Sequence, residues 1–87
     1  MRLFSVGILT DKYTTSQYKI AKTFLENETT HSFKIDPGGE KTLISIRNIP
    51  WLEIPTAVEV ITSLMVRMFT PDKGVMVKFN FLISEDN

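Results

Sequence analysis

The stretches TTSQ (residues 14–17) and TAVE (residues 56–59) decide the fold of this 87-residue chain. In each stretch a threonine is followed three positions later by Gln or Glu, which is the capping-box signature of a helix start. The threonine hydroxyl accepts a hydrogen bond from the amide of the third helical residue, while the Gln or Glu side chain accepts one from the amide of the threonine itself. The sequence therefore predicts two helices, one capped by Thr14 and one by Thr56.

Both predicted helices have one apolar side. Over residues 15–27 and 57–69 the apolar side chains recur at the helical spacing of three and four positions, and charged or polar side chains fill most of the opposite arc. Proline and glycine within residues 71–74 then end the second helix and turn the chain. Each helix is thus predicted to lie on another layer of the structure.

Four further segments alternate apolar and polar side chains, which is the period of a β-strand. They cover residues 3–10, 31–35, 42–49 and 75–83, and the Pro and Gly residues between the second and third segments predict a hairpin. The order strand, helix, strand, strand, helix, strand predicts an α+β two-layer sandwich in a single domain, residues 1–87. It is the ferredoxin-like βαββαβ arrangement, a four-stranded antiparallel sheet with two helices on one face. In an alternative layout the first strand lies at a sheet edge or is exchanged between two subunits.

The composition argues against a catalytic or metal site. The chain has no cysteine and one histidine, so thiolate chemistry, disulfides and Cys-based metal sites are excluded. His31 has no second ligand at a metal-binding spacing, and no serine lies in a nucleophile-elbow motif. We therefore predict that the protein is not an enzyme and uses no cofactor, with no catalytic and no metal-ligating residue.

Charge and hydropathy indicate a cytoplasmic protein with no membrane partner. Ten basic and ten acidic side chains cancel, so the protein has no overall field that would attract nucleic acid or an anionic membrane. No apolar run approaches the roughly 18 residues that span a bilayer. A cysteine-free chain also suits a reducing compartment.

The predicted sheet face opposite the helices is mixed in character. It combines basic side chains with exposed apolar ones, a composition typical of protein–protein interfaces. Trp51 lies in the proline-flanked connection before the second helix and is either an exposed binding anchor or a seal over the end of the core. The predicted partner-binding residues are Lys34, Arg47, Lys78, Leu43, Met76 and Trp51, with Leu9 and Leu82 on the same face.

We accordingly predict a small non-catalytic binding protein, a regulator, inhibitor or subunit of the kind that viruses and mobile elements encode. It acts on another protein through the open sheet face or an edge strand, and a second copy of the chain is a further candidate partner. Nucleic-acid binding through the basic side chains is the alternative, although this face lacks aromatic stacking residues. A weaker alternative is a small-molecule site between sheet and helices, lined by Tyr18, Trp51, Met65 and Met68.

Overall fold

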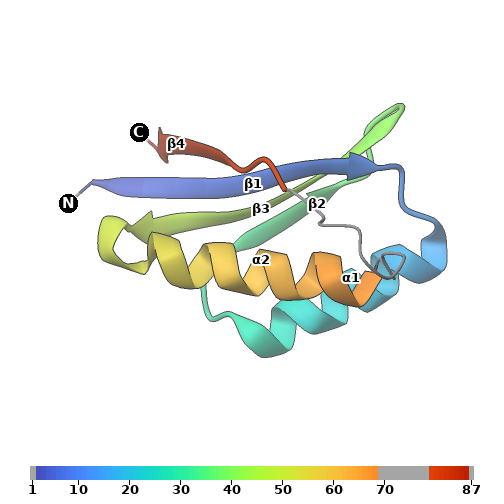
Figure 1. The fold of residues 1–87 in the computed structure, drawn as a ribbon, viewed down its shortest axis with the longest axis horizontal. Helices are drawn as coiled ribbons and strands as arrows, with labels where there is room; N and C mark the ends of the chain where they lie inside the picture. Colours follow the sequence, from blue (N-terminus) through green and yellow to red (C-terminus); the bar gives the residue numbers. More distant parts are fainter. Residues whose placement is uncertain (1, 69–78, 87) are drawn as a thin grey trace, which may run out of the picture.

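The computed structural model describes residues 2–68 and 79–86, which form one sheet covered by two helices. The elements in chain order are β1 (Leu3–Asp11), α1 (Thr15–Glu28), β2 (Phe33–Asp36), β3 (Lys41–Pro50), the 3-10 turn η1 (Trp51–Glu53), α2 (Ile54–Met68) and β4 (Leu82–Asp86). The strand order is β2-β3-β1-β4, and every neighbouring pair is antiparallel. Both helices lie on the same face of the sheet (Figure 1). The predicted α+β class and the four-stranded antiparallel sheet with two helices are confirmed.

The first predicted helix start is confirmed in detail. Thr14 caps α1, since its Oγ1 accepts from the Gln17 amide at 3.1 Å and its own amide donates to the Gln17 Oε1 at 2.9 Å. The helix ends where the Thr29 amide donates to the Leu25 carbonyl at 3.1 Å. The local sequence alone therefore places α1.

We expect the substitution Thr14→Ala to lower the free energy of unfolding by about 1 kcal/mol, because it leaves an amide of the first helical turn without its acceptor. Thr15→Ala is the matched control: Thr15 is exposed and follows the cap, so its loss should change stability by no more than about 0.5 kcal/mol. Urea unfolding followed by circular dichroism measures both. Equal effects of the two substitutions would contradict the capping role.

The second predicted helix start is wrong. Helix α2 begins at Ile54, two positions before Thr56, so Thr56 lies within the first turn instead of preceding the helix. Pro55 explains the difference, because proline is accommodated in a first turn, where the missing amide has no intrahelical partner and the fixed φ suits a helix. The chain thus enters α2 directly from the 3-10 turn η1.

Strand β4 also differs from its prediction. The alternating pattern predicted a strand over residues 75–83, whereas the structure places β4 at Leu82–Asp86, and residues 79–81 precede it outside the strand. The predicted start at residues 75–78 lies outside the described residues. Pairing with β1 explains the shift, since Leu3 lies opposite Asp86 and Gly7 lies opposite Leu82. The polar residues after Ile83 therefore form an edge strand that an apolar pattern does not reveal.

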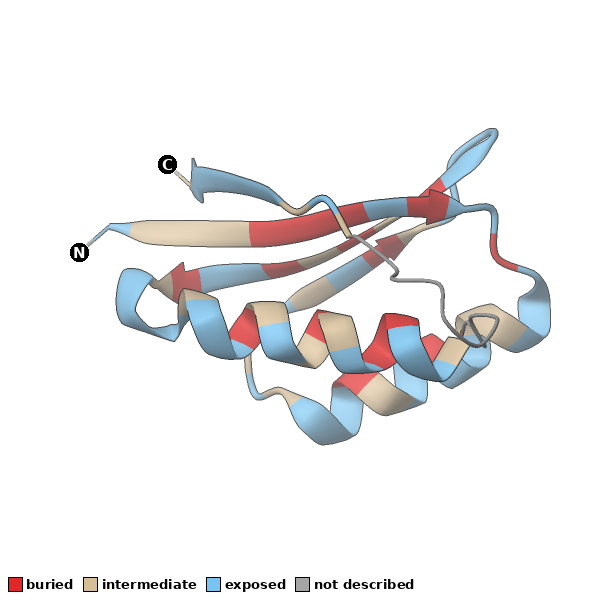
Figure 2. Ribbon diagram, viewed as in Figure 1, coloured by how far each residue is buried: buried red, intermediate tan, exposed pale blue. Residues whose placement is uncertain are grey.

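The core lies between the sheet and the helices, as Figure 2 shows by its buried residues. The strands contribute Val6, Ile8, Ile35, Ile44 and Ile46, which are all buried. The helices contribute Ala21, Leu25, Ala57, Ile61, Leu64 and Met65. The opposite face of the sheet is therefore left to solvent or to a partner.

Two threonines on the helix-covered face of the sheet form a matched pair of buried polar residues. Thr10 and Thr42 lie opposite each other in the β1–β3 pair and both are buried. The Thr42 Oγ1 accepts from the Tyr13 amide at 2.9 Å, whereas the Thr10 Oγ1 has no hydrogen-bond partner among the described residues.

We expect Thr10→Val to raise the free energy of unfolding by about 1 kcal/mol, because it removes a buried hydroxyl that makes no hydrogen bond. Thr42→Val should lower it by about 1 to 3 kcal/mol, because it leaves the buried amide of Tyr13 without an acceptor. Thermal and urea unfolding of the two variants measure the difference. Stabilisation by Thr42→Val would show that this account of the pair is wrong.

Candidate functional site

The open face of the sheet, which we define as the face opposite the helices, is the candidate site. Because the strands pair in a fixed register, side chains directly opposite each other share a face. The open face carries Leu3, Ser5, Gly7, Leu9 and Asp11 of β1, Lys34 and Asp36 of β2, Lys41, Leu43, Ser45, Arg47 and Pro50 of β3, and Leu82, Ser84 and Asp86 of β4. Apolar and charged side chains are thus interspersed on this face.

Three leucines from three strands form the apolar part, which we call the leucine patch (Leu9, Leu43 and Leu82). Leu9 lies opposite Leu43, and Leu82 lies opposite Gly7. A Cβ added to Gly7 would lie 3.6 Å from the Leu43 Cδ1, so the side chain of Leu43 extends toward the glycine. Leu9 is 55% exposed and Leu82 is 53% exposed. The patch is thus a group of apolar side chains, two of which are more than half exposed to solvent.

The other end of the open face is built around a β-bulge. In the β1–β3 pair Phe4 lies opposite Ile49 but Val6 lies opposite Ile46, so Ser5 faces two residues of β3 instead of one. One of these two residues is Asn48. Its φ of 59° lies in the left-handed region, which asparagine tolerates better than most residues. Because of the bulge, Ile46 and Ile49 both reach the core while Arg47 and Asn48 stay exposed.

An aspartate side chain connects three strands at this bulge. The Ser5 Oγ donates to the Asp86 carboxylate, with both oxygens at 2.7 Å, and the Asn48 amide donates to Asp86 Oδ2 at 3.2 Å. We call Ser5, Asn48 and Asp86 the aspartate cluster. The hydrogen bond from Ser5, then that from Asn48 and the charge of Arg47, hold the pKa of Asp86 below its ordinary value, against the opposing effect of desolvation. The cluster therefore favours an ionised Asp86 that ties β4 to β1 and β3.

A second carboxylate next to the cluster provides an internal reference. The guanidinium of Arg2 binds both oxygens of Glu85 at 2.8 Å, and this hydrogen bonding lowers the pKa of Glu85. We expect Ser5→Ala to raise the pKa of Asp86 and to leave that of Glu85 unchanged, and Arg2→Gln to do the reverse. Carboxyl titration by NMR measures both groups. If the pKa of Asp86 were unchanged in the Ser5 variant, the proposed role of Ser5 in the aspartate cluster would be disproved.

The sign of the pH effect follows from these shifts. A carboxyl group with a lowered pKa in the folded state binds protons less readily than it does in the unfolded chain, so it stabilises the fold at neutral pH and loses that contribution as the pH falls below its ordinary value of 3.8. We expect Asp86→Asn to be less sensitive than the native chain to acid in this range. The measurement is the free energy of unfolding of the native chain and of the variant as the pH is lowered. A difference between the two that stays the same at every pH would contradict this expectation.

The predicted charge of the open face is corrected by the structure. The sequence pattern placed only basic charges there, but Asp36 and Asp86 share the face with Lys34 and Arg47. At the far end of β1, Asp11 pairs with Lys41 at 3.1 Å. The cause of the error is that three strands continue beyond their predicted ends: β1 to Asp11, β2 to Asp36 and β4 to Asp86. A mixed face is less suited to a phosphate backbone than an all-basic one.

The predicted partner-binding residues do not all come together. Lys34, Leu43 and Arg47 lie on the open face, on neighbouring strands. Trp51 lies in η1 beyond the end of β3, where it is 67% exposed, so its interpretation as a seal over the core is wrong. Its neighbour Leu52 is 79% exposed and makes η1 a second apolar surface. Met76 and Lys78 lie outside the described residues.

The predicted small-molecule lining is not assembled. Trp51 precedes α2 and Met68 ends it, which separates them by the length of a helix of 15 residues. Met65 is buried in the core.

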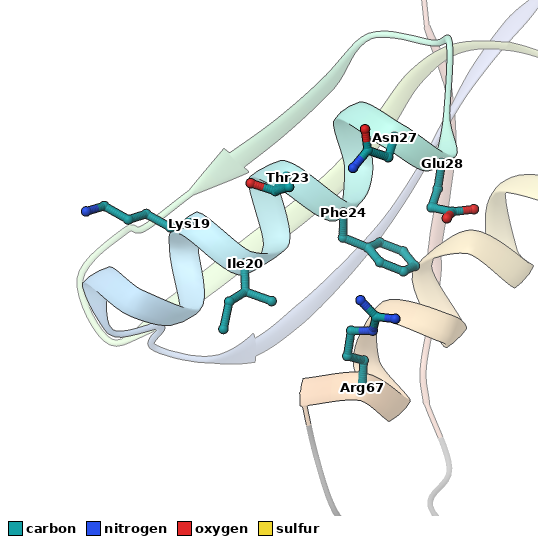
Figure 3. Close-up of a pocket in the computed structure, with 7 residues that line it drawn as sticks. All are labelled: Lys19, Ile20, Thr23, Phe24, Asn27, Glu28 and Arg67. Carbon is teal, nitrogen blue, oxygen red and sulfur yellow. The ribbon is translucent and has the colours of Figure 1, made fainter.

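Two surface hollows lie elsewhere in the described part of the chain. One of about 360 Å³ runs between α1 and α2, where the Arg67 guanidinium carbon lies 5.3 Å from the centroid of the Phe24 ring (Figure 3). Its lining residues are Lys19, Ile20, Thr23, Phe24, Asn27, Glu28 and Arg67. The other, of about 170 Å³, lies beside the His31–Glu53 contact of 3.1 Å. Within residues 2–68 and 79–86, no three His, Asp or Glu side chains are grouped so as to hold a metal ion.

Comparison with protein-family models, with curated proteins and with solved structures finds no match. Among the described helices, none has both the length and the apolar composition needed to cross a membrane. The geometry of the open face is therefore the basis for the function proposed below.

Proposed function

We propose that this protein acts by binding another protein through its open sheet face, without catalysis of its own. The observation that carries the proposal is the leucine patch: three leucines of three neighbouring strands lie on one face of the sheet near Gly7, and two of them are more than half exposed. Exposed leucines grouped on a rigid sheet favour an apolar partner surface. A regulator, inhibitor or subunit would use such a surface.

The surroundings of the patch support a protein partner over nucleic acid. Charged side chains of both signs flank it, Lys34 and Asp36 on β2 and Arg47 and Asp86 beyond the bulge, which is the polar rim typical of protein interfaces. A phosphate backbone would be repelled by the two carboxylates. We therefore rank nucleic-acid binding second, and steep weakening of binding with salt is the property that distinguishes it.

The strand topology and the composition also bear on the fold family and the location of the protein. The strand order β2-β3-β1-β4 places β3 between β1 and β2, and β1 between β3 and β4, so that two strand–helix–strand units interleave. We infer from this that the arrangement is the ferredoxin-like one. The cysteine-free composition supports the cytoplasm as its location.

The proposal is tested by affinity capture from the lysate of the native host, with nuclease treatment. The tagged native chain is compared with the Leu82→Lys variant, which changes the patch at a half-exposed position. We expect a stoichiometric protein that survives nuclease and is lost from the variant. Capture that disappears with nuclease, or that is identical for both chains, would contradict protein binding through this face.

A further inference from the structure

Strand β2 forms one edge of the sheet and has only β3 beside it among the described strands. The Arg47 amide donates to the Ser32 carbonyl at 2.8 Å, so the backbone of Ser32 points toward β3. Backbone direction alternates along a strand, and therefore Lys34 and Asp36 also point their backbone groups toward β3. The amides and carbonyls of Phe33 and Ile35 consequently point away from β3, toward the open edge.

The side chains on this edge are arranged for self-pairing. Lys34 and Asp36 carry opposite charges, both lie on the open face, and they flank Ile35. When two β2 strands run antiparallel with Ile35 opposite Ile35, each Lys34 lies opposite the Asp36 of the other copy. The outward amide and carbonyl of each Ile35 then face those of the second copy, as in a hydrogen-bonded pair of an antiparallel ladder.

We propose that two copies of this chain associate through β2 in this register, joining their two sheets edge to edge. The symmetry is two-fold and closed, because the same strand serves both copies. A register centred on Lys34 would instead place two lysines directly opposite each other, which destabilises a strand pair. Strand β4, at the other edge, carries Glu85 and Asp86 and no basic residue, so it offers no such complementarity to a second copy.

The association goes beyond the proposed function and leaves it intact. A two-fold axis through the shared edge keeps both open faces on the same side of the joined sheet, so the dimer presents two leucine patches to a partner. The contact is short, because β2 has only four residues. Each exposed ion pair also contributes little to the free energy of association. We therefore expect a weak dimer, detected by sedimentation equilibrium between about 10 µM and about 1 mM chain.

Charge reversal tests the pairing. Lys34→Asp places two carboxylates opposite each other at both contacts, and we expect it to weaken dimerisation at least about tenfold. Adding Asp36→Lys restores an attractive pair in the same register, and we expect the double variant to dimerise within about threefold of the native chain. Both positions lie at the solvent-facing side of an edge strand, and circular dichroism verifies that each variant is folded.

Cross-linking tests the register, and the absence of native cysteines makes it unambiguous. Chains with Lys34→Cys and chains with Asp36→Cys are mixed under mild oxidation, and we expect a disulfide between the two kinds of chain in preference to either kind with itself. Ser84→Cys on β4 should not cross-link.

Three results would overturn the dimer: a native chain that stays monomeric throughout the concentration range, a charge swap that fails to restore association, or cross-linking through β4. Substitutions in the leucine patch should leave dimerisation unchanged. Failure of the dimer is therefore distinguishable from failure of the proposed function.

Discussion

Deletion of Arg47 and Asn48 together is expected to reduce the free energy of unfolding by at least about 4 kcal/mol, enough to unfold many small domains. Both residues belong to the bulge that gives β3 one more residue than β1 between the pairs Val6–Ile46 and Phe4–Ile49. Without them Ile49 follows Ile46 directly, and neighbouring residues of a strand point to opposite faces. Ile49, now fully buried, would point to the open face.

The matched control is Asn48→Gly, which keeps the residue count and the left-handed conformation. Glycine adopts the φ of 59° without strain, so we expect a change within about 0.5 kcal/mol. Urea unfolding measures both variants, with the packing of Ile49 followed by its methyl NMR signals. A deletion variant that retains native stability would show that the bulge does not set the faces of β3.

The combined substitution Leu9→Lys and Leu82→Lys is expected to weaken binding of the protein partner at least about 100-fold. Each leucine offers an exposed apolar surface whose burial stabilises a complex by roughly 1 kcal/mol, and a lysine in its place brings a charge that must lose water on binding. Both positions are more than half exposed, so we expect the fold to be retained. Titration calorimetry with the captured partner gives the affinity.

Two controls separate the open face from the other exposed apolar surfaces. Leu52→Lys changes η1, and Val66→Lys changes α2 on the helix layer, and both native residues are exposed. We expect neither to alter the affinity by more than about threefold. Loss of binding in the Leu52 variant, with full binding in the double leucine variant, would move the site to the turn that contains Trp51.

The layers of the fold follow from the sequence because they depend on local signals. The capping box at Thr14 and the alternation in β1 and β3 are properties of neighbouring residues, and the structure confirms both. The start of α2 was misplaced because the cap signal at Thr56 competes with Pro55, which the first turn accommodates. Local signals thus define the elements more securely than their boundaries.

The features that the sequence did not reveal depend on pairing between distant segments. The bulge at Asn48 is a difference in length between two strands, which neither strand shows alone. Strand β4 continues to Asp86 because Ser5, 81 positions earlier, donates to its carboxylate. Asp86 was therefore missed on the open face, and Asp36 was missed because β2 continues one residue beyond its predicted end, whereas Lys34, Leu43 and Arg47 were correctly placed on the face by alternation.

The most direct test of protein binding through the open face is a methyl and amide NMR spectrum of the labelled chain, recorded with and without the partner captured from nuclease-treated lysate. The account predicts that the signals of Gly7, Leu9, Leu43 and Leu82 shift or broaden, while those of Ile20 and Val66 on the helix layer stay in place. Changes confined to the helix layer or to η1, with the leucine patch unperturbed, would contradict it.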